Sequence, residues 1–135
     1  MKKNGGTNVL KKIVKMTAVL LVICLAVTAL AVFAGSADCY LKKSMYNVKS
    51  GYAYGSYASG YLNTYSTSSC TVKANLYGEG GYLTGSTTAS PGTVGVIGVQ
   101  SGHSSWYIYL QPAVSGGSGL GGEAYGRVNT SNTAR

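Results

Sequence analysis

Acidic side chains are scarce in this chain of 135 residues, which contains three of them and a single histidine. A nucleophilic triad needs a histidine oriented by a carboxylate, and glycoside hydrolysis needs two carboxylates facing one substrate. Glu79 and Glu123 lie in Gly-rich segments, which hold side chains poorly, and Asp38 lies at the expected end of a leader. The sequence therefore predicts no enzyme, and we expect His103 to be an exposed loop residue.

Acidic residues are absent before Asp38, whereas the first 15 residues carry five lysines. From Met16 to Phe33 the chain is uncharged and almost wholly apolar, and small residues follow. A basic region, an apolar run and a small-residue stretch are the three parts of a secretory signal peptide. Ala34 and Ala37 both satisfy the small-residue rule for cleavage, and we favour cleavage after Ala37.

The apolar run is also long enough to remain as a membrane anchor. Its length of about 18 residues exceeds a usual signal-peptide core and lies at the lower edge of what spans a bilayer. A buried core helix is a third interpretation, but nothing later in the chain is patterned to cover it. Because the lysines stay in the cytoplasm, we expect residues 1–37 to be a signal peptide or membrane anchor and the rest to be secreted or tethered outside.

Charge of either sign is thin beyond residue 37. Six basic side chains stand against three acidic ones, a net charge of +3, compared with +8 for the whole chain. A strongly cationic domain would suggest nucleic-acid binding, but this thin spread predicts none. The expected partner is a cell-wall or envelope component or a second copy of the chain, with membrane contact only through the N-terminal segment.

Cysteine occurs three times, and Cys24 lies in the apolar leader. Cys39 and Cys70 then have no competitor, and outside the cytoplasm they most simply form one disulfide. Closing a loop of about 30 residues would stabilise the fold by roughly 3–4 kcal/mol. Two free thiols and an intermolecular bond are the alternatives. Two cysteines and one distant histidine predict no zinc site, and no cofactor is expected.

Proline is confined to two positions, whereas all twelve tyrosines and most of the twenty glycines follow the leader. Tyrosine, valine, threonine and serine with frequent glycine form a strand-and-turn composition. Alternation agrees, because Cys70, Val72 and Leu76 share one face of an extended segment. Strands are expected at residues 57–65, 70–77, 82–87, 93–99 and 105–111, with turns at 78–81, 90–92 and 101–104.

These elements predict an all-β fold, a small antiparallel β-sandwich or barrel over residues 38–112, preceded by an N-terminal signal or anchor helix. After Pro112 the composition changes to glycine and serine. We expect residues 113–135 to be a flexible linker and tail, with at most one edge strand at 123–130.

Tyrosine is the residue type in excess. Rows of tyrosine on a sheet offer amphipathic area for stacking on sugars or packing against another protein. The alternative is that cross-strand tyrosine pairs stabilise a thin sandwich with few aliphatic residues. The candidate binding face consists of Tyr52, Tyr54, Tyr57, Tyr61, Tyr65, Tyr107 and Tyr109.

A resemblance rests on the Gly- and Tyr-rich run Ser50–Tyr57, the alternating strand 71–77 and the aromatic strand 106–109. Their composition and order resemble the lactococcin 972 family of bacteriocins, small exported all-β proteins of Gram-positive bacteria that bind the lipid-linked precursor of the cell wall. The chain departs from that family in its cysteine pair and its Gly-rich C-terminal extension.

We expect a secreted, non-enzymatic binding protein that acts at the bacterial cell envelope, and the resemblance implies a bacteriocin-like activity. The alternative is a structural or assembly protein of a cell-surface, spore or biofilm matrix, in which exposed edge strands pair between copies.

Overall fold

The computed structural model describes residues 11–12, 35–114 and 119–134. The chain divides into two units, Met1–Phe33 and Ala34–Arg135, and each is considered by itself. Residues 11–12 of the first unit are helical. Residues 1–10 and 13–34 of the expected signal peptide or anchor helix lie outside the described residues. No helix within the described residues has the length and hydropathy needed to cross a membrane.

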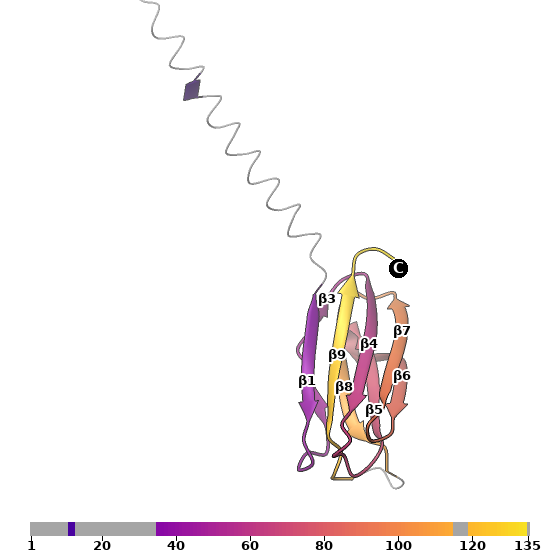
Figure 1. The fold of residues 1–135 in the computed structure, drawn as a ribbon. Helices are drawn as coiled ribbons and strands as arrows, with labels where there is room; N and C mark the ends of the chain where they lie inside the picture. Colours follow the sequence, from indigo (N-terminus) through magenta and orange to yellow (C-terminus); the bar gives the residue numbers. More distant parts are fainter. Residues whose placement is uncertain (1–10, 13–34, 115–118, 135) are drawn as a thin grey trace, which may run out of the picture. The chain divides into compact units, whose positions relative to one another are not determined.

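The second unit is an antiparallel β-sandwich (Figure 1). Its described strands are β1 (Ser36–Leu41), β2 (Val48–Lys49), β3 (Ala53–Tyr54), β4 (Tyr57–Thr64), β5 (Val72–Gly78), β6 (Tyr82–Ala89), β7 (Val94–Ser101), β8 (Ser105–Pro112) and β9 (Ala124–Ser131). Sheet A has the order β1-β9-β4-β7, and sheet B has the order β2-β8-β5-β6, with β3 also paired to β8. This is the strand order of a jelly roll, and it confirms the predicted antiparallel sandwich.

The core lies between the two sheets and follows from the alternation in the sequence. Every second residue of β4 and β8 is buried, because successive side chains of a strand point to opposite faces. Trp106 is the largest fully buried side chain, and its indole N–H donates to the Gly55 carbonyl over 2.8 Å. The other large, fully buried hydrophobic side chains are Leu41, Leu62, Val72, Leu76, Ile108, Leu110 and Val128.

The predicted turns are present. Between β6 and β7, the N–H of Thr93 donates to the Ser90 carbonyl over 3.0 Å, and Gly92 adopts a φ of +79°. Proline at the second position and a positive-φ glycine at the third are the signature of a type II turn. The expected turn at 78–81 contains the single-turn 3₁₀ helix η1 (Glu79–Gly81).

The C-terminal segment differs most from expectation. The strand expected at an edge within residues 123–130 is β9, and it lies inside sheet A between β1 and β4. The expected edge position is therefore wrong, and the sandwich extends to Ser131 instead of ending at residue 112. The physical reason is that β1 pairs along the other side of β9; it begins with Ser36 and Ala37, which were assigned to the leader, and continues through Asp38–Leu41, where no strand was expected.

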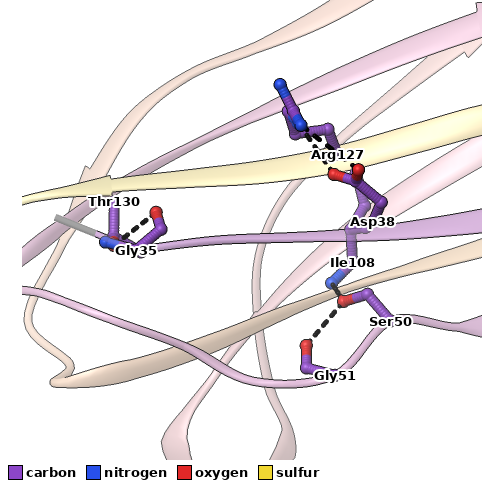
Figure 2. A network of polar contacts seen from close by, with 7 residues as sticks. All are labelled: Gly35, Asp38, Ser50, Gly51, Ile108, Arg127 and Thr130. Atoms are coloured by element: carbon purple, nitrogen blue, oxygen red, sulfur yellow. Dashed lines mark hydrogen bonds and ion pairs between the residues drawn. The ribbon is translucent and has the colours of Figure 1, made fainter.

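Gly35, which directly precedes β1, is joined to β9 by hydrogen bonds (Figure 2). The N–H of Gly35 donates to Thr130 Oγ1, and the N–H of Thr130 donates to the Gly35 carbonyl, each over 2.8 Å. The Thr130 hydroxyl lies 2.7 Å from the Tyr54 carbonyl and donates to it. Cleavage after Ala37 would remove this attachment, whereas cleavage after Ala34 would leave it intact.

The predicted disulfide is not formed, since Cys39 and Cys70 are both free. Cys39 is buried in β1, where its thiol contacts the Ile108 carbonyl at 3.9 Å, and Ile108 is paired with Leu76. Cys39 therefore lies near Leu76, whereas Cys70 lies before Val72, at the other end of β5. The distance from Val72 to Leu76 along the strand is already about 13 Å, which exceeds the reach of a disulfide. Burial, together with the nearby Asp38 charge, raises the pKa of the Cys39 thiol to about 12, so it is protonated at neutral pH.

Candidate binding surfaces

The seven tyrosines of the predicted face do not lie on one face. Tyr57 and Tyr61 point outward from β4 on sheet A, as their spacing predicts, and Tyr65 follows the end of that strand. The remaining four lie on sheet B: Tyr107 and Tyr109 on β8, Tyr54 on β3 and Tyr52 just before β3. The sandwich therefore carries two separate tyrosine surfaces on opposite sides.

The surface on sheet B is a packed aromatic row. The rings of Tyr77 and Tyr107 are stacked across β5 and β8, with centroids 5.1 Å apart and planes 16° apart. Tyr52 meets Tyr107 edge to face at 5.6 Å, and Tyr109 meets Tyr77 edge to face at 6.3 Å. Tyr77 lies on the outer face of β5, and the register between β5 and β8 brings it against Tyr107.

Lys49 completes this row, and the sequence analysis missed it because β2 is too short to show a pattern. Its Nζ lies 4.3 Å from the ring centroid of Tyr107 and 4.8 Å from that of Tyr52, and it donates to the Tyr52 hydroxyl over 3.3 Å. The ring faces of Tyr77 and Tyr107 thus contact protein groups, which supports sheet stabilisation by cross-strand pairs. What this surface offers to a ligand is hydroxyl groups, ring edges and a fixed ammonium group.

Asn75 is an anomaly on the same outer face. It points outward from β5 between Tyr109 on β8 and Ser86 on β6, yet it is only 5% exposed. Its Oδ1 has no hydrogen-bond partner. A buried acceptor without a donor destabilises a fold by about 1–3 kcal/mol. The alternation of β5 puts Asn75 on the outer face, but its burial depends on neighbours such as Tyr109 from another strand.

The outer face of sheet B is also positively charged. Its outward-facing strand positions carry Lys49 and Lys73, and no aspartate or glutamate occupies such a position among the described residues. The one ion pair found in the described part of the chain joins Arg127 and Asp38 on sheet A. Neither lysine on sheet B therefore has a carboxylate partner there.

The surface on sheet A is electrically balanced. Arg127 on β9 donates two hydrogen bonds to Asp38 on β1, over 2.7 and 3.2 Å (Figure 2). These bonds lower the pKa of Asp38, and the same contact raises the pKa of Arg127. Tyr125 lies alongside, 5.1 Å from Tyr40 and 6.2 Å from Tyr61 between ring centroids. Desolvation, the largest cause, raises the pKa of Tyr125.

A third surface is the side of the sandwich where the edge strands β6 and β7 lie together; we call it the β6–β7 side. A methyl group at Gly95 of β7 would lie 2.7 Å from Thr87 Oγ1 of β6, so the two strands touch. Their outward side chains are strongly exposed, from 51% for Val99 to 72% for Val96. The exposed apolar residues on these strands are Tyr82, Leu83, Val94, Val96 and Val99.

The loop that carries the single histidine is packed, which corrects the expectation of an exposed residue. His103 is half-buried, stacked on Tyr82 at 5.9 Å and edge-on to Trp106 at 5.3 Å. Beside it, the Ser104 hydroxyl donates to Glu79 over 2.8 Å. Of the hydrogen bonds found among the described residues, none joins His103 to a serine or a carboxylate, so this loop contains no aligned triad.

No group of three histidine, cysteine, aspartate or glutamate residues lies close enough to hold a metal ion within 11–12, 35–114 and 119–134.

No protein-family model matches this chain, and no curated protein matches it. Among solved structures, it is similar to a protein of Bacillus endospore appendages, described as disulfide-linked pili, with 16% identity, 75% of this chain and 87% of that one covered, and a TM-score of 0.43. It is also similar to a carbohydrate-binding module of family CBM36 in complex with calcium and xylotriose, with 17% identity, 73% and 91% covered, and a TM-score of 0.40. At these TM-scores the likenesses carry no argument about function.

Proposed function

We propose that the β-sandwich is a non-enzymatic structural protein of the bacterial cell surface that self-associates through its β6–β7 side. The observation that carries this proposal is the character of two edge strands. From Gly80 to Gly122 the chain contains no lysine, arginine, aspartate or glutamate, and this stretch includes all of β6 and β7. Both strands are paired on one side only among the described strands.

Edge strands in monomeric proteins are usually protected, because their unpaired N–H and C=O groups attract other strands. Charged side chains, proline, a short length and bulges are the usual protections. β6 and β7 each have eight residues, with no charge and no proline. The bulge in β7 falls opposite Ala58–Gly60, so the stretch Val94–Ile97 keeps a regular register with β4. That stretch is an unprotected edge.

A second copy of the chain is the occupant that fits this edge. A two-fold axis perpendicular to the sheets would set β7 antiparallel to the β7 of the partner copy and β6 antiparallel to its β6. Uncharged strands would then meet uncharged strands, and the exposed valines of the two copies would lie next to each other across the paired β7 strands. An isologous contact of this kind is the commonest way in which identical subunits associate.

Light scattering after size-exclusion chromatography, over a range of protein concentrations, tests this proposal. The wild-type protein is expected to form dimers as concentration rises. Val96→Lys is expected to weaken association several-fold, since it would place ammonium groups of the two copies near each other across the paired strands. Ser36→Lys, at an exposed position on the opposite edge strand β1, is the matched control and should associate like the wild type. A wild-type protein that stays monomeric at every concentration would contradict the proposal.

Binding at the cell envelope is the second candidate, and the positive charge of the outer face of sheet B favours it. The bacteriocin activity implied by the lactococcin 972 resemblance stays a prediction. Growth of related Gram-positive strains in the presence of the purified protein tests it, with clear inhibition expected if the resemblance reflects function.

A further inference from the structure

We infer that the outer face of sheet B is a binding site for an acidic, hydroxyl-bearing polymer, such as a polyol phosphate or an acidic glycan of the cell wall. This site is separate from the β6–β7 side and does not depend on the proposed self-association. Three observations carry it: two unpaired lysines, a row of tyrosine hydroxyls and a buried acceptor without a donor.

The lysines supply the charge. Lys49 is exposed, yet its ammonium group is held in place by two tyrosine rings and one tyrosine hydroxyl. Lys73 points outward from β5, one alternate position from Asn75. From the strand register, the two lysines lie about 10 Å apart across the sheet and about 7 Å apart along it. Repeated anionic groups on a flexible chain would therefore meet both lysines along a diagonal of the sheet.

The surface of sheet B between the two lysines supplies hydrogen-bonding groups. Lys49 is paired with Tyr109, Tyr109 with Asn75, and Lys73 with Gln111. The surface between the charges thus carries one phenol hydroxyl and two amides, which donate to and accept from the hydroxyl groups of a polyol or sugar. A purely apolar or purely anionic partner would leave these groups without bonds.

Asn75 indicates that the hydrogen bonding of this surface is incomplete in the protein alone. It is more than nine-tenths buried on an outward-facing position, and its Oδ1 has no donor. Buried polar side chains nearly always have a partner, so an exception calls for a physical reason. A ligand hydroxyl that donates to Oδ1 after a rotation of the neighbouring Tyr109 ring would supply the missing bond.

The experiment measures binding of protein purified from cells that express the full chain. The probes are polyglycerol phosphate, polygalacturonate and neutral dextran at low and moderate salt. Binding to one or both acidic polymers and not to dextran is expected, and it should weaken as salt rises because the charges are exposed. The polymer that binds more tightly identifies the kind of anion.

Two variants with the same net charge locate the site. Lys49→Gln/Lys73→Gln is expected to weaken binding about tenfold, as for two partly exposed charge contacts. Lys42→Gln/Lys43→Gln removes two exposed lysines from the turn after β1 and should change binding less than about threefold. Asn75→Leu, which keeps the charge, is expected to weaken binding several-fold. Equal losses in the two lysine variants, or no binding of any acidic polymer, would overturn the inference.

Discussion

The two sides of the sandwich treat their edge strands in opposite ways. On one side, β1 carries Asp38, the turn after it carries Lys42 and Lys43, and β2 carries Lys49. On the other side, β6 and β7 carry no charge at all. The comparison shows that charged side chains protect one side against strand pairing between copies, whereas the other side has exposed valines and no such protection.

The two sides also differ in the contacts that hold their edge strands to the rest of the sandwich. The start of β1 is bonded through Gly35 to Thr130, and its middle is bonded through Asp38 to Arg127 (Figure 2). The β6–β7 side is held instead by close packing, in which Ile97 of β7 sits over Gly60 and Gly85. The β1 side, which we call the fastened side, is held by polar contacts. The β6–β7 side is held by close packing against glycines, which let the strands approach each other.

The largest expected effect concerns the fastened side. A chain that begins at Asp38 lacks the bonds between Gly35 and Thr130 and two residue pairs of the β1–β9 ladder. It is expected to unfold with a free energy about 3 kcal/mol lower than a chain that begins at Gly35, at about 1 kcal/mol per bond. Denaturant unfolding of the two chains measures this. Equal stability would show that these bonds contribute nothing.

The same argument predicts the processing site. If the leader is removed, the protein recovered from the medium should begin at Gly35, because cleavage after Ala34 preserves β1. Intact mass spectrometry reads the N-terminus directly, and a mature chain that begins at Asp38 would contradict this choice.

The close packing of the other side gives the next effect. Gly95→Val should lower the free energy of unfolding by about 2 kcal/mol, because the new side chain would collide with Thr87 of β6. Gly98→Val lies on the same strand, where a Cβ would meet nothing within 4 Å, and should cost little. Thermal unfolding of the pair measures the difference. Equal losses would mean that strand propensity, and not the contact between β6 and β7, sets the result.

A substitution of Asn75, which lies between the two sides, is expected to stabilise the fold. Asn75→Leu removes a buried acceptor that has no donor and is expected to raise the free energy of unfolding by about 1 kcal/mol. Asn63→Leu, on the outer face of sheet A, lacks this feature and should change stability little. A loss of stability in Asn75→Leu would mean that the amide is satisfied in the folded protein.

The smallest expected effect concerns the ion pair of the fastened side. Arg127 lowers the pKa of Asp38 in the folded state, so the pair stabilises the fold above the ordinary aspartate pKa of about 4. That contribution is lost as the pH falls through the folded-state value. The free energy of unfolding should therefore fall less steeply on acidification in Asp38→Asn than in the wild type. Parallel curves would show that the pair contributes nothing.

The alternation of residues along the chain predicted most of the strands but little of how they are arranged in the two sheets. The outward and inward positions of β4, β5 and β8 follow directly from residue spacing, and the turn at Pro91–Gly92 follows from its residue types. The central place of β9 could not be predicted, because its partner β1 starts within the leader pattern and its remaining residues, Asp38–Leu41, are too few to show an alternation. The same holds for the free cysteines, since spacing along the chain says nothing of distance between sheets.

The candidate surfaces show the same limit. Tyr52 and Tyr57 are close in sequence, yet they lie on different sheets, because the chain crosses from β3 to β4 between them. Lys49 and Asn75 acquire much of their importance from Tyr107 and Tyr109 on β8, which is far along the chain. A list of tyrosines therefore identified the residue type that matters but not the groups that act with it.

Amide hydrogen exchange at low and high protein concentration tests the central claim most directly, because it reports on individual strands. Pairing between copies predicts that exchange of the amides of β6 and β7 slows as concentration rises, while exchange in β1 stays the same. Exchange in β6 and β7 that is independent of concentration, or that slows equally in β1, would contradict the account.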